Sequence, residues 1–115
     1  MAGGISVHAV DVAHGRPAQG LRVEIWRLAP DRVLLADGQL GTEGTLQGPV
    51  TTGEGVTEGD YEVLFHLGEF FAAQTGEETQ FLTFVPFRFV IRDAHAHFHL
   101  PLKFTPWGYS LFRGA

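Results

Sequence analysis

The residues ISVHAVDVAHGRPAQGLRVEI, from Ile5 to Ile25, decide the predicted fold of this 115-residue chain. Apolar residues occupy every second position at both ends of the stretch: Ile5, Val7 and Ala9, then Leu21, Val23 and Ile25. Such alternation is typical of a strand that buries one face, because successive side chains point to opposite sides of a sheet. The intervening HGRPAQG, residues 14–20, contains the glycine and proline residues with which a chain reverses. We therefore predict two strands that belong to one sandwich.

Strand patterns continue along the rest of the chain. We expect strands at residues 32–40, 61–67, 81–91, 97–104 and 109–112, and one short strand within the glycine-rich segment 41–59. Pro86 cannot donate a ladder hydrogen bond, so its strand should bulge or lie at a sheet edge. Residues 68–79 favour a short helix that Gly76 can terminate. The predicted fold class is all-β: an antiparallel β-sandwich of about eight strands with one short helix, as a single domain over residues 1–115.

Composition disfavours several classes of function. The net charge is −5, from 13 acidic and 8 basic residues, and only one residue is a lysine, so we expect no nucleic-acid partner. Cysteine is absent, which excludes disulfides and thiol chemistry. The first residues lack a basic, signal-like segment and no apolar run is long enough to cross a membrane, so we expect a cytoplasmic protein with no membrane partner. Hydrophobic residues make up 44% of the chain, which hints at buried subunit surfaces.

Histidines are the candidate chemical groups. His95, His97 and His99 alternate along a predicted strand and should project from one face. His99 has apolar neighbours, where an imidazole needs a hydrogen-bond partner or a task, whereas His95 is most simply a solvated residue. His8 interrupts the first strand, and by itself is more simply structural than catalytic. A second interpretation makes the histidines metal ligands that leave one position open to water, although no carboxylate or cysteine is suitably spaced; we expect neither a metal nor a cofactor.

Three motifs together resemble a known family. They are S-x-H-x-x-D followed by G-R-P-A-x-G, FFAAQTGEE, and H-F-H-x-P-L leading to P-x-G-Y-S and a terminal R-G, at residues 6–20, 70–78 and 97–114. Over nearly the whole chain they are similar to the 5-hydroxyisourate hydrolases, the enzymes related to the hormone carrier transthyretin. The resemblance implies a transthyretin-like sandwich and a homotetramer, a dimer of dimers with sites in the channel between dimers. It also implies that the end of the chain folds into the active site.

The resemblance assigns roles by matched position. His8 and His99 correspond to the catalytic histidines, Arg113 to the arginine of the terminal motif, and His97 to the neighbouring histidine, while we take Asp11 to be structural. Two imidazoles can activate water and protonate the leaving nitrogen of a cyclic ureide near pH 7. An arginine is the expected stabiliser of the developing oxyanion.

Several positions depart from the family pattern. Thr45 stands where a second arginine is usual, Phe112 where tyrosine is usual and Ala115 where serine is usual, and FLTFV at residues 81–85 replaces F-Y-P-E-V. With these changes a pocket lined by Thr45, His97, Tyr109, Ser110, Phe112 and Ala115 would be less polar, because a bidentate cation and two hydroxyls are gone.

The chain is therefore predicted to be a hydrolase of a cyclic amide, ureide, imide or lactone, with a small-molecule substrate that differs from 5-hydroxyisourate. Arg92 or Arg16 could compensate for the missing cation, which would keep the ordinary 5-hydroxyisourate hydrolase open as an alternative. A non-catalytic small-molecule carrier is the other alternative, although it would have little need for buried imidazoles.

Overall fold

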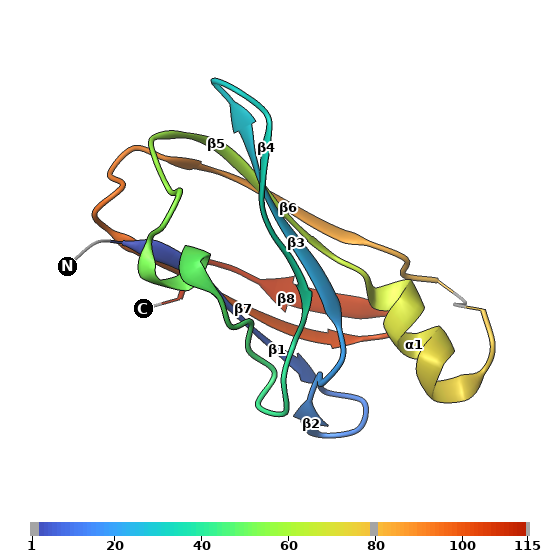
Figure 1. Cartoon of the computed structure of the whole chain (residues 1–115). Helices are drawn as coiled ribbons and strands as arrows, with labels where there is room; N and C mark the ends of the chain where they lie inside the picture. The colour runs from blue at the N-terminus through green and yellow to red at the C-terminus, as the bar shows by residue number, and fades with distance from the viewer. Residues whose placement is uncertain (1–2, 79–80, 115) are drawn as a thin grey trace.

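Two four-stranded sheets face each other in the computed structural model, which describes residues 3–78 and 81–114 (Figure 1). The first sheet has the order β2-β1-β7-β8, with bounds Arg16–Pro17, Gly4–Asp11, His97–Thr105 and Gly108–Leu111. The second has the order β4-β3-β5-β6, with bounds Val33–Gln39, Arg22–Ala29, Gly59–Phe65 and Val85–Ile91. One α-helix, α1 (Leu67–Thr75), and one 3-10 helix, η1 (Pro49–Thr52), complete the described elements. The all-β sandwich with one short α-helix is thus confirmed.

Most strand pairs are antiparallel, but β1 and β7 run parallel. Their register extends from Gly4 opposite His97 to Asp11 opposite Phe104, so it spans the full length of β1. Parallel neighbours need a long connection, and here the whole second sheet lies between them in sequence. The two ends of the chain therefore lie at one end of the sandwich, and α1 lies at the other (Figure 1).

The core lies between the sheets and follows from the alternating pattern. Ile5, Val7 and Ala9 of β1 are at most 1% exposed, as are Val23 and Ile25 of β3. The intervening side chains therefore face outward from each sheet. At the α1 end, Phe70 and Phe71 of the helix pack edge-on against Phe104 of β7, with ring centroids 5.6 and 5.7 Å from it. This aromatic contact holds the helix over the end of the sandwich.

The positions of one proline and one glycine agree with the sequence prediction. β6, which contains Pro86, is an edge strand. Gly76 ends α1 in the left-handed conformation with φ 75°, a conformation that glycine adopts without the penalty of a Cβ atom. The predicted helix extended to Thr79, which lies outside the described residues. No helix among residues 3–78 and 81–114 is long and apolar enough to cross a membrane.

Other local predictions were wrong. Residues 41–58 contain no strand in the structure, and β5 begins only at Gly59; the backbone of residues 41–58 forms the 3-10 helix and one isolated bridge, at Thr45. Four glycines with positive φ, at 44, 48, 53 and 55, explain why this segment cannot stay extended. The reversal at residues 14–20 was predicted, and it carries the chain from the first sheet to the second. The short strand β2 within it was not predicted. His95 precedes β7, in a turn.

We predict that the buried hydroxyl of Tyr61 stabilises the loop before β5. It donates to the Thr57 carbonyl at 2.6 Å and accepts from the Thr57 amide at 2.9 Å. Tyr61→Phe removes both hydrogen bonds and should lower the free energy of unfolding by about 1–2 kcal/mol in urea denaturation. Tyr109→Phe is the matched control: Tyr109 is 50% exposed and its hydroxyl makes no hydrogen bond within the described chain, so we expect a change below about 0.5 kcal/mol. Equal effects of the two substitutions would contradict this account.

Candidate active site

Four chain segments place a row of polar groups across the outer face of the first sheet. Thr45 forms an isolated bridge with His8 at one side of β1, and β7 lies at the other. Ser6 is opposite His99 in the β1/β7 register. Beyond β7, Gly114 of the terminal segment forms an isolated bridge with His99. The loop, both inner strands and the end of the chain therefore meet at this face.

Ser6 joins two of the imidazoles. Its Oγ lies 2.8 Å from Nε2 of His97 and 2.7 Å from Nδ1 of His99. The Nδ1 of His97 lies 3.1 Å from the carbonyl oxygen of Gly3. These three contacts form a continuous hydrogen-bonded chain from the backbone, through His97 and Ser6, to His99.

The environment of His99 favours its neutral form. Its side chain is partly buried, and burial lowers its pKa below the ordinary value of 6.5; the imidazoles of His8 and His97 lower the pKa further. Because the pKa is lowered, the ring is neutral at pH 7 and offers a nitrogen lone pair. The effect of His8 on this pKa also indicates that the two imidazoles are close enough to interact.

His8 and Thr45 lie at the loop side of the row. His8 is half-buried, and its imidazole makes no hydrogen bond within residues 3–78 and 81–114. The Oγ of Thr45 accepts a long hydrogen bond of 3.4 Å from the side-chain amide of Gln47. The position where the family pattern has an arginine therefore offers a hydroxyl and a neutral amide.

The terminal segment is attached to β7. The Gly114 amide donates to the His99 carbonyl at 2.6 Å. A Cβ atom at Gly114 would lie 3.1 Å from Cδ2 of His99 and 3.2 Å from Cδ of Pro101. Only glycine lets the backbone approach the catalytic candidate this closely without a shift. The predicted folding of the chain end against this site agrees with the geometry.

Arg113 makes no hydrogen bond to an imidazole within residues 3–78 and 81–114. Its guanidinium carbon lies 4.3 Å from the centroid of the Phe98 ring, and Nη2 donates to the His97 carbonyl at 3.2 Å. Phe98 is buried on the core-facing side of β7. The antiparallel register that pairs Leu102 with Leu111 and His99 with Gly114 puts Arg113 beside Leu100, on that same side. Arg113 and Leu100 both line a small apolar cavity of about 150 Å³.

The other predicted pocket residues do not all lie on the same face of the sheet. Ser110 is paired with Lys103 and lies on the same outer face as His97 and His99. Tyr109 is paired with the core-facing Phe104, and its ring is half-exposed at the sheet edge. Phe112 is also half-exposed, and Ala115 lies outside the described residues.

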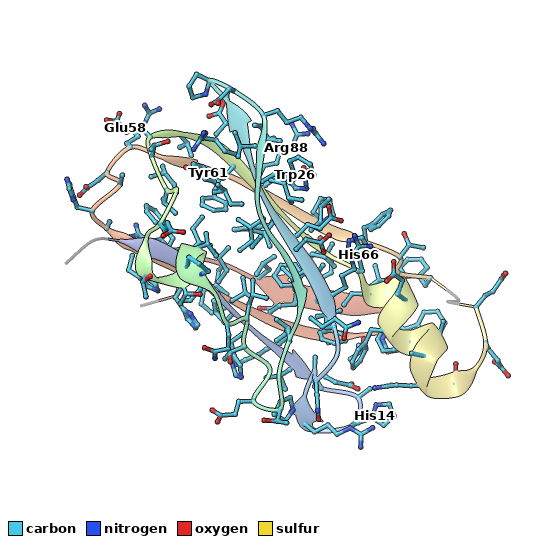
Figure 2. All side chains as sticks on the ribbon, in the orientation of Figure 1. His14, Trp26, Glu58, Tyr61, His66 and Arg88 are labelled. Carbon is cyan, nitrogen blue, oxygen red and sulfur yellow. The ribbon has the colours of Figure 1, made fainter. Side chains whose placement is uncertain are left out.

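The remaining histidines have other environments. His14 binds the fully buried Asp11, through Nδ1 at 2.7 Å, which agrees with a structural role for that acid. His66 lies at the start of α1 (Figure 2) and donates to Glu24 at 2.6 Å; this hydrogen bond is the main cause of the lowered pKa of Glu24. His95 is exposed before β7. In the described part of the chain, no three His, Asp or Glu side chains gather as ligands for a metal ion.

Sequence reasoning missed the role of Ser6. The signal was available in the S-x-H pattern of β1, because residues two apart in a strand share a face. What the pattern could not show is the partner strand, since the residues of β7 that pair with β1 lie 93 positions further along the chain.

Comparisons with known proteins identify the family of this chain. A model of the HIUase/Transthyretin family matches residues 5–114. The chain belongs to the HIUase/transthyretin family. It is 40% identical to "5-hydroxyisourate hydrolase 2" of Rhizobium meliloti (strain 1021) over 116 residues, which cover 98% of this chain and 97% of that protein. The "5-hydroxyisourate hydrolase" of Deinococcus radiodurans is 33% identical over 97% of this chain and 96% of its own length.

Solved structures give the same family. The Klebsiella pneumoniae 5-hydroxyisourate hydrolase has a TM-score of 0.78 and 28% identity, and covers 98% of this chain and 99% of its own. A structure of (S)-allantoin synthase has a TM-score of 0.88 and 35% identity over 99% of this chain, which spans 44% of that longer protein. Sea bream transthyretin in complex with thyroxine, with a TM-score of 0.85 and 20% identity, shows the fold alone. The relatives named 5-hydroxyisourate hydrolase support a hydrolase of this family.

We predict that NMR titration of the imidazole resonances will give His99 a pKa below 6.5. His8→Gln should raise this pKa, because it removes one of the charges that oppose protonation of His99. His95→Gln, which changes an exposed histidine outside β7, should leave it unchanged. A His99 pKa at or above its ordinary value would contradict the described environment.

Proposed function

We propose that this protein is a hydrolase that opens a cyclic amide, ureide, imide or lactone, with His99 and His8 as its acid/base pair. The observation that carries the proposal is the pairing of a neutral, partly buried His99 with a second imidazole, His8, on one sheet face beside the end of the chain. Neutral imidazoles with pKa values near the working pH are suited to moving protons in both directions. The relatives named 5-hydroxyisourate hydrolase support the reaction class.

The proposed reaction begins at His99. Its free ring nitrogen removes a proton from water while the water oxygen bonds to the ring carbonyl carbon of the substrate. The resulting tetrahedral intermediate collapses as the carbon–nitrogen or carbon–oxygen bond of the ring breaks. His8 delivers a proton to the departing atom, and the product carries a new carboxyl group. His99 then loses its proton and His8 regains one by exchange with solvent, so the protein returns to its starting state.

We propose that Arg113 provides the cation for the developing oxyanion after its guanidinium leaves Phe98. A single donor of this kind is worth about 100-fold or more in rate. In the resting chain the contacts of Arg113 with Phe98 and the His97 carbonyl hold the terminal segment beside His99. We assign substrate contacts to Thr45, His97, Tyr109, Ser110, Phe112 and Ala115.

The substrate proposed here differs from 5-hydroxyisourate because of Thr45. Threonine cannot supply the charge-assisted, bidentate contact that an arginine makes. Arg16 lies on β2, opposite Asp11, and Arg92 follows β6 of the second sheet, so we propose that neither compensates for the missing arginine within this chain. A site with a hydroxyl and a neutral amide beside His8 suits a substrate with less negative charge than one held by a second arginine.

We further propose that the active protein is a homotetramer, a dimer of dimers. His97 is exposed and the imidazole row lies on an open sheet face, so a second copy is needed to close a pocket over it. Exposed apolar side chains, among them Trp107 and Phe112, are consistent with buried subunit contacts.

Ordinary 5-hydroxyisourate hydrolysis is the second candidate. The 40% identity with "5-hydroxyisourate hydrolase 2" over nearly the full length of both proteins favours it. It requires that the reaction tolerate threonine at position 45.

We predict that His99→Gln and His8→Gln each lower hydrolysis by about 100-fold or more, because general acid/base groups contribute on that scale. The assay follows freshly generated 5-hydroxyisourate spectrophotometrically, together with a panel of cyclic imides, ureides and lactones. His95→Gln should keep wild-type rates, because His95 is exposed and precedes β7. Hydrolysis that survives both substitutions would exclude the proposed pair, and ligand binding without turnover by the wild type would indicate a carrier.

Thr45→Arg tests the altered substrate. If the missing cation limits the ordinary reaction, this substitution should raise the rate of 5-hydroxyisourate loss by about 100-fold. Thr52→Arg places the same charge on the exposed 3-10 helix and should give no gain. Rapid loss of 5-hydroxyisourate with the wild type, unchanged by Thr45→Arg, would favour the ordinary enzyme instead.

A further inference from the structure

We propose that Ser6 is a positioning residue that relays a proton from His99 to His97, so that the exposed His97 imidazole holds the charge produced when water is activated. This inference rests on the proposed hydrolase function. Its structural basis is the position of the Ser6 hydroxyl, 2.7 Å from Nδ1 of His99 and 2.8 Å from Nε2 of His97. Both distances are those of strong hydrogen bonds.

The backbone carbonyl of Gly3 sets the direction of the hydrogen-bond chain. A carbonyl oxygen can only accept, so the hydrogen of neutral His97 lies on Nδ1 and points to Gly3. The Nε2 of His97 is then an acceptor, and it takes the hydroxyl hydrogen of Ser6. The Ser6 oxygen in turn accepts from Nδ1–H of His99. The Nε2 of His99 is left with a lone pair, which is the form needed to remove a proton from water.

Removal of that proton shifts each hydrogen by one position. Water gives a proton to Nε2 of His99, Nδ1 of His99 gives its hydrogen to the Ser6 oxygen, and Ser6 gives its own hydrogen to Nε2 of His97. His99 gains a hydrogen on Nε2 and loses one from Nδ1, and the Ser6 oxygen gains one and loses one, so only His97 gains a net proton. His99 ends neutral with a hydrogen on Nε2, and His97 ends as an imidazolium. Loss of one proton to solvent after product release restores the first arrangement.

The surroundings favour a charge on His97 over one on His99. His99 is partly buried, and this burial lowers its pKa. The imidazoles of His8 on β1 and His97 on β7 lower it further. His97 is exposed and donates to the Gly3 carbonyl, so a proton added to its ring would be in contact with solvent. Arg113 contacts the carbonyl of His97, but its guanidinium lies on the core-facing side, over Phe98. The relay therefore removes the charge from the partly buried ring.

Nitrogen-15 NMR of the histidine rings tests the hydrogen positions without any substrate. At about pH 8.5, where histidines are neutral, His97 and His99 should both show hydrogen on Nδ1. Ser6→Ala should release His99 into a mixture of both tautomers, whereas Ser6→Thr, which keeps a hydroxyl, should retain the wild-type pattern. A wild-type His99 with its hydrogen on Nε2 would overturn the relay.

Kinetics separate the relay from the hydrolase proposal. We expect Ser6→Ala to lower kcat by about 10- to 100-fold with little change in KM, and Ser6→Thr to restore most of the rate. The control is His95→Gln, which lies outside the hydrogen-bonded chain. Turnover that survives Ser6→Ala within about twofold would overturn the relay and leave the hydrolase intact. The expected tautomers without turnover of any cyclic substrate would overturn the hydrolase, and the catalytic relay with it.

Discussion

The parallel pairing of β1 with β7 is the constraint on which the site depends. It joins residues that lie 93 positions apart in the sequence, and it places Ser6 beside His99 and Gly4 beside His97. A slip of one residue in β1 would turn Ser6 and His8 into the core and expose Ile5 and Val7, because side chains alternate between the faces. Burial of Ile5, Val7 and Ala9 therefore fixes the register, and the register fixes the imidazole geometry. The apolar face of β1 and its polar face are specified by the same pairing.

Local features could be predicted from the sequence because they depend on local physics. Alternation identified the long strands, Pro86 identified an edge and Gly76 identified the end of α1. The parallel pair could not be found in this way, since no local pattern distinguishes a parallel from an antiparallel partner. The strand predicted within segment 41–59 was wrong for a different reason: positive φ at Gly44, Gly48, Gly53 and Gly55 favours turns before β5 begins at Gly59.

The candidate site shows the same division. His8, His97 and His99 were identified from residue type, spacing and family resemblance, and they do share one sheet face. Ser6 needed the partner strand before its contacts could be recognised. The side on which Arg113 lies needed the antiparallel register of the terminal segment, which places its guanidinium over Phe98. The sequence therefore identified the candidate residues, whereas the pairing of the strands decided which of them are in contact.

The alternation of side chains between the two faces of β1 also explains why a hydroxyl rather than a carboxylate orients His99. Asp11 lies on the same strand as Ser6, but on the core-facing side together with Ile5 and Val7. There it is fully buried and bound to His14. A carboxylate beside His99 would stabilise an imidazolium there and raise its pKa. A serine accepts a hydrogen and donates one, so it can orient the ring without holding the charge on it. The lowered pKa of His99 and the exposure of His97 are both consistent with a site that keeps its base neutral and moves the proton outward.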